Sequence, residues 1–328
     1  PLFHRYQKIL LCALSVGVAL AGRERGDHVI TSAVEHPAVT NVCDWLRGQG
    51  FRVTVLPVDG QGMVDPGDLE RAIDSRTLLV TVMHANNEVG SLQPVAALAE
   101  IAHGHGALLH TDAAQSVGKV PVRVDELGAD LLSVAGHKLY APKGIGALFR
   151  RQGVRLAPVL HGAGQEGGLR PGTENVLEIV GLGRACEIAG RDLAANEAHM
   201  RAMRDRLHAG LAAELGEEAM RLNGHAEKRL PNTLSVSFRA VEANALLSAI
   251  GDEVAASAGA ACHAGEVDVS AVLRAMRVPV DWAMGTVRFS VGRETTAGEV
   301  DRAVAVVAGA ARRLRAQGGL AAPVLARE

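Results

Sequence analysis

The sequence predicts an α/β fold of two domains, a large domain with a mostly parallel sheet and a smaller α+β domain after it. Two observations support this prediction. Short runs of β-branched residues alternate with helical patterns through the first half of the chain, and near residue 190 this pattern changes into longer helices with isolated strands. We therefore expect a large domain at residues 1–190 and a small C-terminal domain at residues 191–328.

The elements of the large domain follow one another in a regular order. Apolar and β-branched segments predict strands at residues 28–34, 51–56, 77–82, 107–112, 130–132 and 147–149. Amphipathic segments between them predict helices at residues 35–46, 65–73 and 94–103. In sheets of this kind ligands bind beyond the carboxyl ends of the strands, so we expect a site there.

The small domain is predicted from a different pattern. Helices are expected at residues 192–215, 243–250 and 299–317, and strands at residues 234–238 and 287–291. The segment 257–265 consists mostly of small residues and predicts a loop. These elements indicate an α+β arrangement.

The composition is that of a globular protein that acts on a small molecule or another protein. The chain has 328 residues, of which 48% are hydrophobic and 21% charged, and its formal net charge is −2. This charge provides no attraction to nucleic acid or to an anionic membrane, and with 3% aromatic residues we expect no stacking on bases. The apolar segment 9–21 is too short to span a bilayer, and we interpret it as a helix.

The four cysteines are scattered, without the close spacing that zinc sites and redox motifs use. This usage suits a reducing compartment, and we expect the cytoplasm. Cys12, Cys43 and Cys186 are interpreted as small buried side chains. Cys262 differs, because it stands beside His263 in the segment of small residues, where a thiolate would be accessible.

An acid and an amine follow two neighbouring strands of the large domain. Asp112 ends one strand, and Lys138 follows the next one after a Gly-His turn. Pyridoxal phosphate (PLP) needs such a pair, because a lysine holds it as a Schiff base and an acid keeps its pyridine nitrogen protonated, so that the ring acts as an electron sink. Each residue alone also suits a simpler role, as a surface lysine after a glycine turn and as a helix-capping aspartate.

Four further residues are candidates for the same site. His36 suits either stacking on a planar cofactor or capping of the following helix, and Asn87 suits either a cofactor oxygen or a simple Asn-Gly turn. Thr173 lies in the glycine-rich segment 162–175, which is either a connection or a cradle of backbone amides for a phosphate. Arg293 follows the last strand and suits a substrate carboxylate or a surface salt bridge.

Seven short segments with these residues occur in a fixed order along the chain. They are Glu35-His36, Asn86-Asn87-Glu88-Val89-Gly90, His110-Thr111-Asp112-Ala113-Ala114-Gln115, Gly136-His137-Lys138, Arg170-Pro171-Gly172-Thr173-Glu174-Asn175, Ala260-Ala261-Cys262-His263 and Ser290-Val291-Gly292-Arg293. The series resembles the NifS/IscS group of cysteine desulfurases and the related selenocysteine lyases, in the class V aminotransferase family. The resemblance extends over residues 26–316 and implies fold type I of the PLP-dependent transferases.

The resemblance also implies a role for each candidate residue. The cofactor would be bound by Lys138 at its aldehyde, Asp112 at the pyridine nitrogen, Gln115 and Asn87 at the ring oxygen, His36 on the ring face, and His137 and Thr173 at the phosphate. Thr173 would come from the other subunit of a homodimer. Cys262 would be the nucleophile that forms a persulfide, Lys138 or His36 would move protons, and Arg293 together with Asn87 would bind the substrate.

Two departures from the family's pattern concern the phosphate. Family members carry a Gly-Ala-Thr-Glu-like phosphate-binding loop before the first strand identified here, whereas residues 1–20 contain no such loop, so we expect the large domain to be incomplete at its start. The position two residues before His137 is often Ser in the family, and here it is Ala135, which has no hydroxyl.

The activity that the resemblance implies is the conversion of L-cysteine to L-alanine, with the sulfur held as an enzyme persulfide. An acceptor protein such as an iron–sulfur scaffold would then take the sulfur. Two alternatives remain open. One is a lyase that acts on L-selenocysteine, and the other is a cofactor-poor, inactive homologue that serves as a binding partner, which the missing phosphate loop favours.

Overall fold

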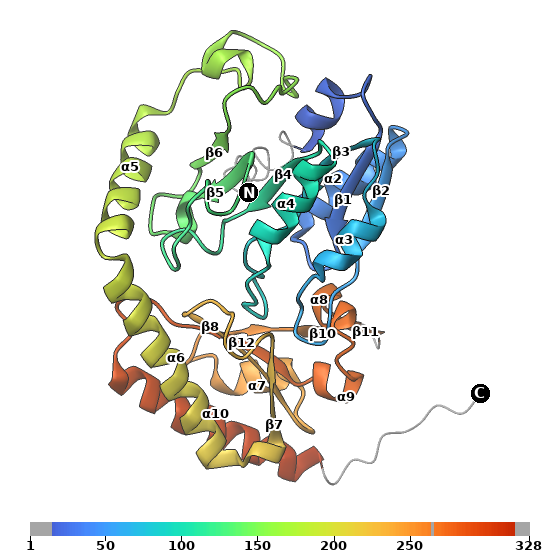
Figure 1. Cartoon of the computed structure of the whole chain (residues 1–328). Coiled ribbons are helices and arrows are strands. Elements are labelled where there is room, and N and C mark those ends of the chain that lie inside the picture. Colours follow the sequence, from blue (N-terminus) through green and yellow to red (C-terminus); the bar gives the residue numbers. More distant parts are fainter. Residues whose placement is uncertain (1–14, 264–265, 319–328) are drawn as a thin grey trace, which may run out of the picture. The chain divides into compact units, whose positions relative to one another are not determined.

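The computed structural model describes residues 15–263 and 266–318, with the backbone alone for residues 260–263 and 266–268 (Figure 1). Contacts divide the chain into two compact units. Unit 1 comprises Pro1–Asn87 and Ser91–Ala194, and unit 2 comprises Glu88–Gly90 and Ala195–Glu328. Each unit has its own sheet and its own hydrophobic core.

Unit 1 is built on a six-stranded sheet in the order β2-β1-β3-β4-β5-β6. The strands are β1 (His28–Ser32), β2 (Arg52–Leu56), β3 (Thr77–Thr81), β4 (Leu108–Asp112), β5 (Leu131–Ala135) and β6 (Gly146–Arg150). The first five are parallel, and β6 is antiparallel to β5. Because β1 and β3 are buried along their whole length, they read as continuous apolar and β-branched runs. All six predicted strands of the large domain are confirmed.

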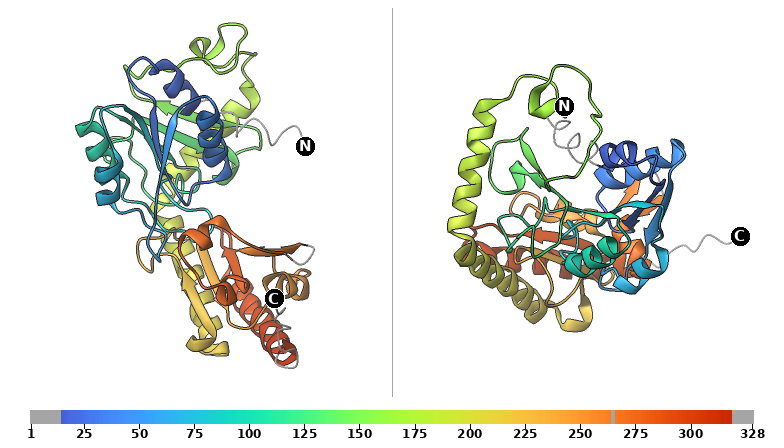
Figure 2. Two further views of the ribbon diagram at one scale, coloured as in Figure 1. Left: turned by 90° about the vertical axis from the view of Figure 1, so that its right-hand side faces the viewer. Right: turned by 45° about the horizontal axis from the view of Figure 1, so that its top comes forward.

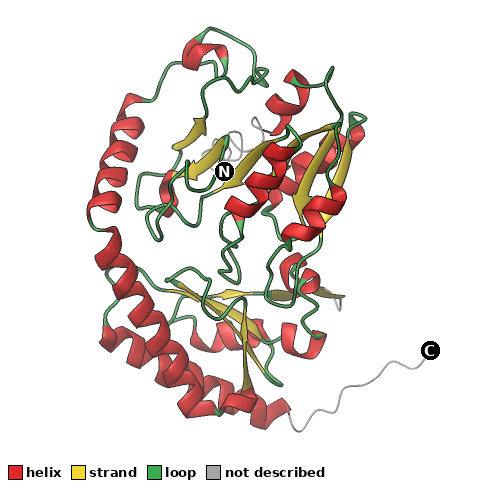
Figure 3. Ribbon diagram, viewed as in Figure 1, coloured by secondary structure: helices red, strands yellow, loops and turns green. Residues whose placement is uncertain are grey.

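Helices alternate with these strands, as Figure 3 shows. They are α2 (Pro37–Gly48), α3 (Pro66–Ala72) and α4 (Val95–Gly104), which confirms the three predicted helices. Both α2 and α3 begin with a proline after a capping side chain, which suits the first helical turn. On α2, Val42 and Leu46 are buried with Val29 of β1 and Leu79 of β3. This packing fixes α2 on the sheet and thereby places its N-terminus at the end of β1.

Two further helical segments belong to unit 1. Residues 15–21 are helical, which confirms the predicted helix for the part of 9–21 that the structure describes. Helix α5 (Val176–Arg191) follows the glycine-rich segment, within which lies a short 3-10 turn, η2 (Gln165–Gly168). No helix in the described part of the chain is both long and apolar enough to cross a membrane.

Unit 2 contains a four-stranded antiparallel sheet in the order β7-β8-β12-β9. Its elements are α6 (Leu193–Leu215), β7 (Met220–Asn223), β8 (Thr233–Phe238), α7 (Ala243–Ile250), β9 (Ser257–Ala258), β10 (Ala260–His263), β11 (Glu266–Val269), α8 (Ala271–Ala275), α9 (Val280–Ala283), β12 (Thr286–Ser290) and α10 (Ala297–Gly318). Helices α6 and α10 lie side by side (Figure 2), and the Arg206–Asp301 ion pair joins them. The predicted helices and strands of the small domain are confirmed, while β7, β11, α8 and α9 add to them.

The prediction of a loop at 257–265 is wrong for residues 257–258 and 260–263, which form strands. Strand β9 pairs with β12, and β10 pairs with β11 in an antiparallel hairpin. Alanine, serine and glycine have little strand propensity, so the pairing partners and not the local sequence make these strands. The backbone of Cys262 therefore lies on β10, opposite Val267. Its side chain lies outside the part of the structure that is described.

The cysteines interpreted as buried differ in their surroundings. Cys43 is buried, and burial raises the pKa of its thiol to about 11, which confirms the interpretation for this residue. Cys186 is exposed, so the interpretation is wrong there. Helix α5 buries Leu182 and Ala185 and turns Cys186 away from them. Cys12 lies outside the described residues.

Candidate active site

One edge of the unit 1 sheet gathers most of the predicted site residues. Because β1, β3, β4 and β5 are parallel, their carboxyl ends lie at the same edge. Asp112 is the last residue of β4, and the turns after these strands carry His36, Asn87, Gln115, His137 and Lys138. The strand order reverses between β1 and β3, and the crevice at such a reversal is where doubly wound sheets bind ligands.

The turn after β5 presents Lys138. It is a 3-10 turn, η1 (Gly136–Lys138), in which Gly136 N donates a hydrogen bond to Ile145 O (3.1 Å). A Cβ on Gly136 would lie 2.8 Å from that carbonyl oxygen, so only glycine allows the two segments to approach so closely. Lys138 is exposed at the end of this turn, next to the half-buried His137. The local sequence thus combines a fixed backbone with an accessible amine.

Asp112 is a buried acid at the end of the neighbouring strand. Its Oδ1 accepts a hydrogen bond from Ala114 N (2.9 Å). Burial raises the pKa of the Asp112 carboxyl to about 6, against the opposite effects of the Ala114 amide and of Lys138. The electrostatic interaction with Lys138 shows that the structure brings the predicted acid and amine together. A buried carboxylate in this position is stabilised by a cationic partner.

Two hydrogen bonds tie the turn after β1 to the turn after β3. Glu35 Oε1 accepts from Met83 N (2.8 Å), and also from Ser32 Oγ (2.6 Å) on its own turn. Asn86 Nδ2 donates to Val34 O (3.0 Å). These bonds fix the two turns that carry the next residues in sequence, His36 and Asn87.

Glu35 is itself a titratable group of this edge. Burial raises its pKa to about 8; hydrogen bonds from Ser32 and Met83 oppose the shift, and Asp112 adds to it. At neutral pH the Glu35 carboxyl is therefore mostly protonated. Sequence reasoning missed it, although its place beside His36 at a strand end was visible.

His36 caps helix α2. Its Nδ1 accepts a hydrogen bond from Ala38 N (3.1 Å), so the neutral ring carries its proton on Nε2. The capping role that was one of two interpretations is confirmed. The bond also fixes the orientation of the ring, while stacking of this ring on a cofactor stays a prediction.

Two buried histidines form hydrogen-bonded bridges between segments near this edge. His110 on β4 bonds Thr81 Oγ1 of β3 through Nδ1 (2.7 Å) and Ser133 Oγ of β5 through Nε2 (3.0 Å). His84 Nδ1 lies 2.9 Å from Ser116 Oγ. Burial lowers the pKa of His110 to about 3 and that of His84 to about 4. Both rings are neutral at pH 7 and act as structural bridges.

Sequence reasoning also missed Lys119, in the segment after β4. Its Nζ donates to the backbone oxygens of Gln115 (2.9 Å) and Lys138 (3.3 Å). It thus links two of the predicted cofactor-binding turns. The only sequence signal was a lysine four residues after Gln115 in an otherwise apolar and small stretch.

The other predicted residues lie in other places. Thr173 is exposed in the glycine-rich segment, where Arg170 Nη1 donates to its backbone oxygen (3.4 Å). Arg293 belongs to unit 2 and lies 3.6 Å from the carboxylate of Glu294. Cys262 belongs to unit 2 as well.

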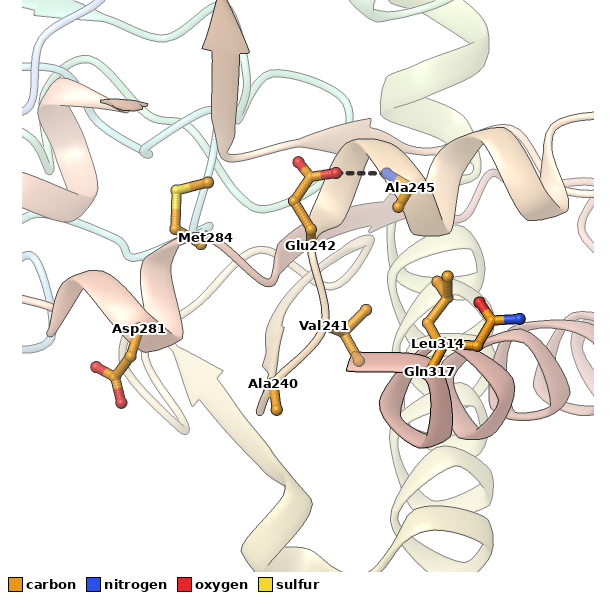
Figure 4. A pocket seen from close by; sticks show the side chains of 8 residues that line it. All are labelled: Ala240, Val241, Glu242, Ala245, Asp281, Met284, Leu314 and Gln317. Atoms are coloured by element: carbon orange, nitrogen blue, oxygen red, sulfur yellow. Dashed lines mark hydrogen bonds between the residues drawn. The ribbon is translucent and has the colours of Figure 1, made fainter. Parts of the chain in front are cut away.

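Unit 2 also has a pocket of about 510 Å³ (Figure 4). Val241, Met284 and Leu314 provide apolar walls, and Glu242 and Asp281 provide acidic ones. The two Glu242 oxygens accept hydrogen bonds from the first amides of α7, so this acid acts as a helix cap. None of the predicted site residues lines this pocket, and we assign no chemistry to it.

The functional groups at the unit 1 edge fit PLP by their chemistry. Lys138 provides an amine for the aldehyde, and buried Asp112 provides an acid for the ring nitrogen. His36 provides a planar ring, while Asn87 and Gln115 provide amides. For the phosphate the fit is weaker, because Ala135 at the start of η1 has no hydroxyl.

Comparisons with known proteins show the family of the chain. Residues 9–303 match the family model of Aminotransferase class-V. A cysteine desulfurase IscS of Methanosarcina thermophila is 45% identical over 300 residues, which are 91% of this chain and 74% of that protein. A solved NifS-like protein aligns with a TM-score of 0.85 at 36% identity, covering 92% of this chain and 80% of its own. A structure described as SspA in complex with cysteine aligns with a TM-score of 0.71 at 33% identity, covering 88% of this chain and 80% of its own.

Proposed function

The chain belongs to the aminotransferase class-V family and is a cysteine desulfurase, and we propose that the residues at the carboxyl edge of the unit 1 sheet bind its PLP. The observation that supports this most directly is the pair Asp112 and Lys138. A buried acid and an exposed amine end neighbouring parallel strands and interact electrostatically. This pair is what the cofactor's ring nitrogen and aldehyde need.

The remaining contacts follow from the positions of the turns. Lys138 Nζ would hold the aldehyde carbon covalently, and Asp112 would hold the proton of the ring nitrogen. His36 would cover the ring face, and Asn87 and Gln115 would contact the ring oxygen. When bound, PLP supplies an electron sink that weakens bonds at the substrate's α-carbon.

The chain's own groups would do the proton chemistry. Asp112 keeps its negative charge in a buried place, because Glu35 beside it is protonated and the two acids share a single charge. Lys138 Nζ, or Nε2 of His36, would take and return a proton near the substrate. The Glu35 and Asn86 hydrogen bonds hold the two turns in the geometry that this transfer requires.

Unit 2 would supply the groups that handle the substrate. The Arg293 guanidinium would bind the carboxylate of L-cysteine, with Asn87 of unit 1 also in contact with the substrate. The Cys262 thiol would take the substrate's sulfur and form a persulfide. The carbon–sulfur bond breaks, the carbon skeleton keeps the electron pair and gains the thiol's proton, and L-alanine results. The persulfide sulfur would then pass to an acceptor such as an iron–sulfur scaffold protein.

We also propose a homodimer, in which His137 binds the phosphate of its own subunit's cofactor and Thr173 binds the phosphate in the other subunit. Two features of unit 1 support it. Thr173 is exposed, and the first turns of α5 directly after it expose Val176, Leu177 and Val180, of which Leu177 is 81% exposed. An apolar cluster of this kind on a soluble chain suits a subunit interface, and closed two-fold dimers are the commonest soluble assembly.

The position of the cofactor can be tested by trapping. Protein loaded with PLP is reduced with borohydride, digested, and mapped by mass spectrometry. We expect the pyridoxyl group on Lys138. A label on Lys119 or Lys143 would contradict the assignment, and protein that shows no visible PLP absorption after addition of the cofactor would support the inactive homologue.

A further inference from the structure

His84 is a buried histidine that no step of the proposed chemistry uses. It follows β3 and is 7% exposed. Its backbone N donates a hydrogen bond to Asp112 O (2.9 Å), and its ring Nδ1 lies 2.9 Å from the buried Oγ of Ser116. One residue therefore contacts both ends of the segment 112–116, which follows β4.

The direction of the ring's hydrogen bond follows from the other contact of Ser116. Ser116 Oγ donates its single proton to Ala113 O (3.2 Å), so towards the ring of His84 it accepts. The donor is therefore the N–H at Nδ1. Burial lowers the pKa of His84 to about 4, so the ring is neutral at pH 7 and its other nitrogen, Nε2, carries no proton.

The segment 112–116 carries two of the proposed cofactor contacts. Asp112 is buried at the end of β4, and the half-buried Gln115 directly precedes Ser116. Their side chains would meet two atoms of one rigid ring, the nitrogen and the oxygen. The ring can contact both only if the distance between the two side chains is fixed, and a segment that already holds this distance binds without an ordering cost.

The bonds of the segment differ in what they hold. Ala114 N donates to Asp112 Oδ1 (2.9 Å) and Ser116 N donates to Ala113 O (3.1 Å), so both bonds shape the turn from within. The two bonds to His84 attach the turn to the end of β3. The backbone bond to Asp112 persists with any side chain at position 84, so a substitution there removes only the hold on Ser116.

We propose that His84 is a positioning residue for Gln115: its Nδ1–H holds Ser116 Oγ and thereby sets the distance between the Gln115 amide and the Asp112 carboxyl group. This inference rests on the proposed function, in which both side chains contact PLP. It also assigns a property to the apoprotein, since the hydrogen bond and the tautomer are present without cofactor.

Nitrogen-15 NMR of the apoprotein, labelled at its histidines, tests the hydrogen bond. The signals of His84 are identified by their loss in His84→Leu. At about pH 7 we expect the proton of this ring on Nδ1, and in Ser116→Ala, which removes the acceptor, we expect the Nδ1 signal to shift. A ring protonated on Nε2 would overturn the proposal.

Titration of the apoprotein with PLP, followed by visible absorption, tests the positioning. We expect His84→Leu and Ser116→Ala each to raise the Kd for PLP about tenfold, the change that loss of one hydrogen bond produces. His84→Asn should bind as the wild type does, because the amide of Asn places an N–H where Nδ1–H was. His105→Leu, at an exposed position of unit 1, is the matched control and should have no effect.

The same titration in a Gln115→Ala background separates positioning from a merely structural role. If His84 acts through Gln115, adding His84→Leu to Gln115→Ala leaves the Kd unchanged. The same loss of affinity in both backgrounds, an equal loss in His84→Asn, or wild-type affinity of His84→Leu would each overturn the proposal. Borohydride mapping of Lys138 tests the proposed function independently, so PLP found on Lys138 together with any of these three results would refute this inference alone.

Discussion

Replacement of Glu35 by Gln tests whether this carboxyl is protonated in the folded protein. Glu35 is buried, and its pKa is raised from 4.5 to about 8. Between these values the folded protein holds one proton more than the unfolded chain, so stability is full below pH 4.5 and falls as the pH rises toward 8. The loss is about 1.4 kcal/mol per pH unit while the unfolded group is ionised and the folded one is not. Between pH 6 and pH 8 it amounts to about 2 kcal/mol, since the folded group begins to ionise at the upper end.

The Gln variant removes this loss and keeps the geometry, because an amide oxygen accepts the hydrogen bonds from Ser32 and Met83. We measure urea unfolding of the apoprotein at about pH 6 and pH 8. The wild type should lose about 2 kcal/mol more than Glu35→Gln over this range. Glu24→Gln, at an exposed position, is the matched control and should behave as the wild type. An equal pH dependence in Glu35→Gln and wild type would refute the reasoning.

Three further changes have defined outcomes. Asp112→Asn keeps the oxygen that accepts a hydrogen bond from Ala114 N but loses the negative charge. We therefore expect kcat for L-cysteine to fall about 10- to 100-fold, while the urea midpoint stays within experimental error. A variant with near-full activity would show that Asp112 does not contact the ring nitrogen. Gly136→Ala places a methyl group against the Ile145 carbonyl and should lower the free energy of unfolding by about 1–3 kcal/mol. Gly164→Ala, whose added methyl group meets nothing within 4 Å, should leave the stability unchanged. Equal stability of the two variants would show that the backbone of η1 moves to accommodate the methyl group. Leu177→Asp should convert the proposed dimer to monomer in sedimentation, and a wild type that is monomeric with full cofactor occupancy would refute the dimer.

The sheet of unit 1 was predictable because its strands carry their own signal. β1 and β3 are short apolar and β-branched runs, and the polar pairs Glu35-His36 and Asn86-Asn87 follow them within a few residues. Since parallel strands bring their ends to one edge, the sequence also predicted that His36, Asn87 and Asp112 share that edge. The interaction of Asp112 with Lys138 bears out this argument for the central pair.

The other features of the site and of the small domain could not be predicted from the local sequence, because they depend on contacts between distant segments. Glu35 meets Met83, 48 residues away, and Lys119 meets Lys138, 19 residues away. Neither contact produces a hydrophobic pattern in the sequence by which it could be predicted. The strand β9 is made by its pairing with β12 and not by its small residues.

The Cys262→Ala variant, which tests the sulfur transfer, also tests the choice between L-cysteine and L-selenocysteine. If Cys262→Ala loses alanine formation from L-cysteine but keeps it from L-selenocysteine, the thiol is needed only for sulfur. Selenium is the better leaving group, so this outcome would favour an enzyme that also acts on selenocysteine. Loss with both substrates would favour the persulfide route alone.

The most direct test of the account is the rate of alanine formation from L-cysteine by three PLP-loaded proteins: wild type, Cys262→Ala and Cys186→Ala. Cys186 is an exposed thiol on α5 and controls for the loss of a cysteine as such. We expect wild type and Cys186→Ala to form alanine at the same rate, and Cys262→Ala to form none. Alanine formation by Cys262→Ala at the wild-type rate would contradict the persulfide mechanism proposed for this chain.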